Sequence, residues 1–143
     1  MTDASTDLPT RKGTWAWVLT LGSLICPVIA PLVFVVAGVF AYHWYNKQRD
    51  VGAVNARNAA NWTITYALVS VICAVVVYLL GVFSSLAPFV LGALAFVFLG
   101  VWVVATLMTI AYGVMGIVAA VKGRAFETAF TWRPVKGAAS WDG

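Results

Sequence analysis

The feature that most constrains this chain is a run of 64 consecutive residues without Asp, Glu, Lys or Arg, from Asn58 to Val121. As a helix, at about 1.5 Å per residue, such a run would be about 96 Å long, roughly three times the hydrocarbon core of a bilayer. The run must therefore turn back, and Ser84, Ser85 and Pro88 supply residues that are typical of a turn. We expect a membrane span on each side of this turn.

An earlier uncharged run, from Gly13 to Asn46, contains Pro27 and Pro31 near its middle. Each proline removes a helical hydrogen bond and crowds the preceding turn. Two structures fit this run: a single transmembrane helix over 14–42 that is broken at the prolines, or a re-entrant hairpin with its apex at the prolines. We expect the broken span, with the prolines facing protein or ordered water, because a lipid-facing break leaves backbone groups unpaired.

The composition also argues against a soluble enzyme and against a disordered chain. Hydrophobic residues make up 62% of the 143 residues and charged residues 10%, against about 45–50% and about 25% in soluble domains. The predicted fold is an all-α integral membrane protein with three transmembrane helices and short interfacial helices. Its parts are a polar tail over 1–13, a membrane domain over 14–121 with spans at about 14–42, 61–82 and 88–121, and a basic, aromatic tail over 122–143.

Basic residues gather at one set of span ends, whereas the turn between the second and third spans carries no charge. Because basic residues favour the cytoplasmic side, we expect both basic segments in the cytoplasm and the N-terminal tail outside, in a multi-pass protein of the bacterial inner membrane. In the hairpin alternative, all 9 basic residues would be cytoplasmic. The basic residues expected at the membrane surface are Lys47, Arg49, Arg57, Lys122, Arg124, Arg133 and Lys136.

The third expected span carries a face of small residues, spaced three or four apart as on one side of a helix. It comprises Ala105, Thr109, Gly113, Gly116, Ala120 and Gly123. Small residues let helix backbones approach closely in lipid, where no hydrophobic force drives helices together. The face is predicted to pack against the first and second spans of this chain, or alternatively to receive a helix of another protein.

A polar cluster precedes the second span, with Asn55, Asn58 and Asn61 at three-residue intervals and Thr65 one turn further on. Amides near a span need hydrogen-bond partners, so they either bind the first and third spans at the cytoplasmic boundary or face water.

Aromatic residues lie among the basic residues of the tail. Phe126 and Phe130 would share one face of a helix, with Trp132 nearby. Together with the tail's basic residues, these aromatics predict a segment that lies on an anionic membrane surface.

Residues that carry chemistry are sparse. The only histidine, His43, has no Cys, Asp or Glu beside it, and Cys26 and Cys73 lie in different apolar runs as small, reduced side chains. No span contains an ionisable acid or base of the kind that a proton relay or ion pump needs. We therefore predict no catalytic residue, metal site, cofactor, small-molecule substrate or nucleic-acid partner.

The segment Arg57–Ile64 resembles a small bacterial membrane-protein family of unassigned function that is similar to the twenty-kilodalton chloroplast inner-envelope translocon protein. The resemblance covers about residues 25–136, implies three spans and suggests a link to translocation. It departs at Arg133, where that family has an aromatic residue before the proline. The positions that carry it are Pro31, Ala59, Asn61, Trp62, Ala120, Lys122, Gly123, Phe126, Phe130, Trp132 and Pro134.

These features predict a non-enzymatic accessory or assembly subunit, with the lipid bilayer and other membrane-protein subunits as its partners. A respiratory complex is the host that we consider first. The alternative is a channel-forming or protein-translocation component with a polar lumen formed in an oligomer. That lumen would be lined by Asn55, Asn58, Asn61, Thr63 and Thr65.

Overall fold

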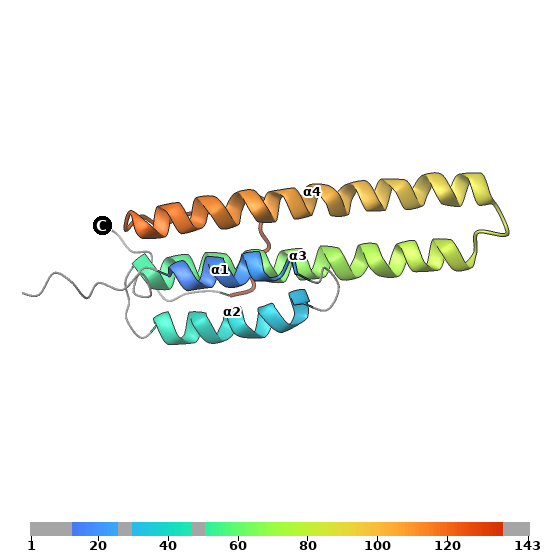
Figure 1. Cartoon of the computed structure of the whole chain (residues 1–143). Coiled ribbons are helices and arrows are strands. Elements are labelled where there is room, and N and C mark those ends of the chain that lie inside the picture. Colours follow the sequence, from blue (N-terminus) through green and yellow to red (C-terminus); the bar gives the residue numbers. More distant parts are fainter. Residues whose placement is uncertain (1–12, 26–29, 47–50, 136–143) are drawn as a thin grey trace, which may run out of the picture.

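The protein is entirely α-helical in its regular structure, as far as the described residues extend. A computed structural model describes residues 13–25, 30–46 and 51–135. These contain α1 (Thr14–Gly22), α2 (Ala30–Asn46), α3 (Val51–Val82) and α4 (Pro88–Val121) (Figure 1). The prediction of an all-α protein is confirmed for these residues.

The two short helices α1 and α2 form an antiparallel hairpin beside the first half of α3 (Figure 1). α1 runs parallel to α3, because Gly13 lies against Gly52 and the hydroxyls of Thr20 and Thr63 are 2.9 Å apart. α2 runs antiparallel to α3, because it packs along the same half of α3 and ends only four residues before α3 begins. The first apolar run therefore returns to the end of the molecule at which it started.

In place of the expected single broken helix over 14–42, the described residues of this run form two antiparallel helices. The nine residues of α1 extend only about 14 Å, roughly half the hydrocarbon thickness. Pro31 does not interrupt a helix but lies in the first turn of α2, where its missing N–H has no helical partner to lose. Pro27 lies outside the described residues.

Only α3 and α4, among the described helices, are long and apolar enough to cross a membrane. They have 32 and 34 residues. The described helices therefore do not confirm the expected three spans. α4 coincides with the third expected span, whereas α3 begins at Val51, ten residues before the expected start of the second span.

The molecule divides into a compact base and an extended arm (Figure 1). The base consists of α1, α2, residues 51–66 of α3 and residues 106–121 of α4. The arm consists of residues 67–105, in which the rest of α3 and of α4 are joined by a short turn. Every buried residue of α4 lies in the base, and no residue of α3 beyond Cys73 is buried. The base therefore holds almost the whole core.

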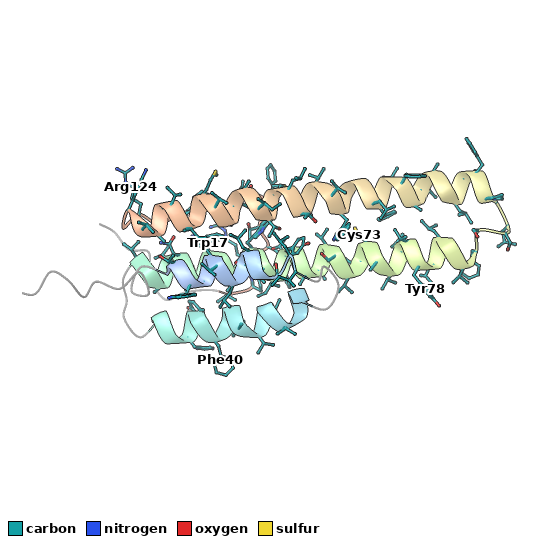
Figure 2. All side chains as sticks on the ribbon, viewed as in Figure 1. Trp17, Phe40, Cys73, Tyr78 and Arg124 are labelled. Carbon is teal, nitrogen blue, oxygen red and sulfur yellow. The ribbon has the colours of Figure 1, made fainter. Side chains whose placement is uncertain are left out.

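The small-residue face of α4 packs against α1 inside the base. A Cβ at Gly116 would overlap the indole of Trp17, which is fully buried and points from α1 toward α4 in Figure 2. A Cβ at Gly113 would overlap the end of the Leu21 side chain. Of the six residues in this face, Thr109, Gly113, Gly116 and Ala120 are buried, Ala105 is half-buried and Gly123 is exposed. The buried members thus form a contact within the chain.

We expect Gly116→Ala to destabilise the protein by about 1–3 kcal/mol, because the added methyl group meets a rigid indole in a packed core. Gly113→Ala should cost less, since the Leu21 side chain can change rotamer. Gly100→Ala is the matched control in the arm of the same helix, because nothing lies within 4 Å of its added Cβ. Thermal unfolding in detergent, followed by circular dichroism, measures all three variants. Equal melting temperatures for the Gly116 and Gly100 variants would contradict this packing.

Candidate functional site

The segment after α4 turns back and lies against α3. The turn is a Schellman motif: the Arg124 N–H donates to the Ala119 carbonyl at 2.9 Å, and the Gly123 N–H donates to the Ala120 carbonyl at 3.0 Å. Gly123 has a φ of 68°, which a glycine adopts without strain. We call residues 124–135 the tail; within them the structure has turns and extended chain but no helix.

Three asparagines on α3, which we call the asparagine ladder, bind the main chain of the tail. Its members are Asn55, Asn58 and Asn61, all buried. Asn55 accepts from the Phe126 N–H at 2.9 Å and donates to the Arg124 carbonyl at 3.0 Å. Asn61 accepts from the Val135 N–H at 2.9 Å and donates to the carbonyl of the same residue at 3.2 Å.

Asn58 completes the ladder by donating to the Phe126 carbonyl at 2.8 Å. A side-chain amide carries both a donor and an acceptor, so it can pair with a backbone N–H and C=O at once. The three-residue spacing of these amides places them on one face of α3. The ladder therefore holds an extended main chain in place without requiring particular side chains from it.

The tail runs along α3 from the end of the base near Asn55 to the junction of the base with the arm. Its Trp132 N–H donates to the Thr65 hydroxyl at 3.1 Å, ten residues along α3 from Asn55. A turn at this level is closed by the Thr131 hydroxyl, which donates to that of Thr128 at 2.6 Å. Within this turn Phe130 has a φ of 56°, a left-handed conformation that is uncommon for an aromatic residue.

Phe126 enters the base, where the tail contributes to an aromatic cluster. Its ring meets Trp17 edge-on at a centroid distance of 5.5 Å and Tyr112 at 6.0 Å, and Tyr112 meets Trp62 at 4.7 Å. Phe130 instead is almost fully exposed. The expectation that Phe126 and Phe130 share a helix face is wrong, because the tail is not helical.

A belt of polar contacts joins three helices at the junction of base and arm. The Trp62 indole N–H donates to the Thr109 hydroxyl at 3.1 Å, and the hydroxyls of Tyr66 and Thr106 are 3.3 Å apart. The Thr20–Thr63 contact lies at the same level. Sequence reasoning singled out neither Trp62 nor Tyr66 for this role; the available signal was a polar group on α3 matched by threonines on α4.

The other predicted residues occupy separate places. Lys122, Arg124 and Arg133 are exposed, and Arg57 is half-buried; Arg133 lies 3.8 Å from Glu127. His43 is exposed beside the Tyr42 ring, and Cys73 is a buried free thiol. Within the described residues, no three His, Cys, Asp or Glu side chains could hold a metal ion. Four further residues named in the sequence analysis, Cys26, Lys47, Arg49 and Lys136, lie outside the described residues.

The amides of the asparagine ladder bond to the main chain of the tail, and Asn55 also lies against Gly13 at the start of α1. Asn55, Asn58, Asn61 and Thr63 are all buried within the chain, and Thr63 contacts Thr20 of α1, so an open lumen lined by them would require both the tail and α1 to move away. The arrangement is that of a main-chain clamp.

We expect Asn61→Leu to loosen the tail, because the Val135 N–H and carbonyl lose both partners, at a net cost of about 1–3 kcal/mol. Trypsin cleavage after Arg124, measured in detergent, should become faster than in the unmodified protein. Ser84→Ala, in the exposed turn of the arm, is the control and should leave the cleavage rate unchanged. Equal cleavage rates for both variants would show that the ladder does not restrain the tail.

Comparison with known proteins gives a family match that spans the whole described fold. The model of the magnetosome magnetite crystal formation protein family matches residues 11–135, a stretch that contains the four helices, the asparagine ladder and the tail. No curated protein and no solved structure matches the chain. The expectation of a small bacterial membrane-protein family is supported, whereas the resemblance to the chloroplast translocon protein receives no support. The chain belongs to the magnetosome magnetite crystal formation protein family.

Proposed function

We propose that this protein is a non-enzymatic component of the magnetosome membrane that acts in magnetite crystal formation by assembling with other membrane proteins through its base. The family match supports the setting. It also moves the proposed host from a respiratory complex to the magnetosome. Membrane insertion is supported by the arm, in which residues 88–105 of α4 extend about 27 Å, close to the thickness of a hydrocarbon core.

The observation that carries the assembly role is an apolar surface longer than a bilayer is thick. The 34 residues of α4 extend about 51 Å, so with the arm in the hydrocarbon core about 20 Å of the helix lies beyond it. The base is nevertheless apolar on two opposite outer faces, one on α2 and one on α4, with α1 and α3 between them. Phe40 on the α2 face points away from the bundle in Figure 2. The exposed apolar residues of the α2 face are Val33, Val36 and Phe40, and those of the α4 face are Leu107, Ile110, Val114, Met115, Val118 and Val121.

An exposed apolar patch outside the lipid core is typical of a protein interaction site. The small-residue face of α4 is already covered by α1, so the partner surface of this proposal is the outward face of α2 around Phe40. A partner helix there would cover apolar side chains that, in this placement, lie beyond the hydrocarbon core and would otherwise face water.

The base faces the cytoplasm in this proposal, because its end carries Lys122 and Arg124. The α1–α2 hairpin supports placing the N-terminal tail on that same side, in contrast to the expectation from a broken span.

We expect a cysteine introduced by Ser5→Cys, in a chain with Cys26 and Cys73 replaced by Ala, to resist a membrane-impermeant maleimide in intact cells. Ser84→Cys, in the turn of the arm, is the matched control and should be labelled. Both positions should react once the membrane is permeabilised. Labelling of Ser5→Cys in intact cells would place the N-terminal tail outside the cytoplasm and contradict the hairpin topology.

We expect a photoreactive phenylalanine at position 40 to form protein adducts in the native membrane, because the proposal seats a partner on the base. The same probe at Phe96, an exposed arm residue, should form lipid adducts instead. Mass spectrometry identifies both kinds of adduct. Lipid adducts alone at both positions would contradict the assembly role and leave membrane insertion standing.

The role in crystal formation can be tested in a magnetite-forming bacterium whose own family member has been deleted. The unmodified chain should restore crystal size and number, measured by electron microscopy. Phe40→Asp should not restore them, although the variant reaches the membrane at the same level. If neither chain restores crystal size and number, the proposed role in crystal formation is contradicted.

A further inference from the structure

We infer that the turn of the tail, residues 128–133, anchors the protein at the lipid headgroups. In this arrangement Phe130 and Trp132 enter the outer edge of the hydrocarbon, and the Arg133 guanidinium binds a lipid phosphate. The inference rests on the proposed insertion of the arm and identifies where the membrane boundary falls on the molecule.

The level of the turn coincides with the start of the arm. The Trp132 N–H bonds to Thr65 at 3.1 Å, and the adjacent Tyr66 hydroxyl lies 3.3 Å from that of Thr106 on α4. Beyond this level α4 carries no polar side chain apart from the indole of Trp102, as far as its start at Pro88. On the other side of this level lie the asparagine ladder and the tail. The turn therefore lies where the polar contacts of the base give way to the apolar segment of α4 in the arm.

The turn presents apolar side chains outward at that level. Phe130 is 91% exposed and Trp132 is 60% exposed. A left-handed φ of 56° at Phe130 is a strained conformation for an aromatic residue, held by the bonds of its neighbours Thr128, Thr131 and Trp132. Phe126, four residues earlier, is turned into the base. Phe126 thus attaches the tail to the base, whereas the side chains of Phe130 and Trp132 are exposed.

Aromatic side chains beside a basic residue suit the headgroup region of a bilayer. Tryptophan favours this region because its ring is apolar and its N–H is polar. The Arg133 side chain is largely exposed. Its Nη2 lies 3.8 Å from Oε2 of the exposed Glu127 carboxylate, so the guanidinium N–H groups are available to another acceptor. A guanidinium pairs with phosphate oxygens through two parallel bonds. Phosphate is common to neutral and anionic phospholipids, so the anchor does not depend on one headgroup.

Spin-label accessibility in vesicles tests this placement. The full chain, with Cys26 and Cys73 replaced by Ala, is labelled at one of three introduced cysteines and reconstituted in phosphatidylcholine–phosphatidylglycerol vesicles. The positions are Ala129 in the turn, Phe96 in the arm and Lys122 at the outer end of the base, all exposed. The ratio of the label's collision rate with oxygen to its collision rate with a water-soluble nickel complex reports the depth of each label.

We expect the label at 129 at the phosphate level, the label at 96 in the hydrocarbon and the label at 122 in water. A label at 129 as accessible to nickel as that at 122, with 96 still in the hydrocarbon, would overturn the anchor and leave the proposed insertion intact. A label at 96 in water would refute the insertion itself.

Phe130→Gly separates anchoring from folding, because glycine relieves the left-handed backbone while removing the ring. We expect this variant to melt in detergent at the same temperature or higher, and in vesicles to give the label at 129 at least a twofold higher nickel accessibility. Unchanged accessibility in a folded Phe130→Gly, Trp132→Ala chain would show that these rings do not hold the turn in the bilayer.

Discussion

The pairing of the tail's main chain with the asparagine ladder is the interaction on which the base depends. A non-helical segment packed against helices has backbone groups that need hydrogen-bond partners, and three buried amides on α3 would be equally costly without partners. The two sets of groups satisfy each other, because Asn55 and Asn61 both donate hydrogen bonds to and accept them from the main chain of the tail. With the tail held, Phe126 reaches the rings of Trp17 and Tyr112, so the pairing also completes the core.

The long helices could be predicted because their signals are local. An uncharged run, a turn rich in serine and a proline at the first helical position mark the bounds of α4 at Pro88 and Val121, and the structure has the same bounds. The start of α3 could not be predicted in this way. Asparagines before an apolar run resemble a helix boundary, but here they continue the helix, since the tail supplies the partners that water would otherwise supply.

The hairpin and the tail depend on contacts between residues far apart in the chain. Asn61 and Val135 are 74 positions apart, and no periodicity records such a pairing. Phe126 and Phe130 have helical spacing, yet Gly123 ends α4 in a Schellman motif and the chain beyond it is extended. The prolines in the first apolar run indicate a break, but whether the chain then continues across or turns back depends on whether α3 offers a surface for α2.

The two parts of the molecule are held together by different forces. Close packing and hydrogen bonds can each fix the relative positions of helices. The base has both: glycines against Trp17 and Leu21, and polar bonds from Trp62 and Tyr66 to α4. Within residues 67–105, no described side-chain hydrogen bond joins the two helices of the arm. The contacts that fix the relative positions of the helices therefore lie in the base. The partner surface proposed above lies on this part of the molecule.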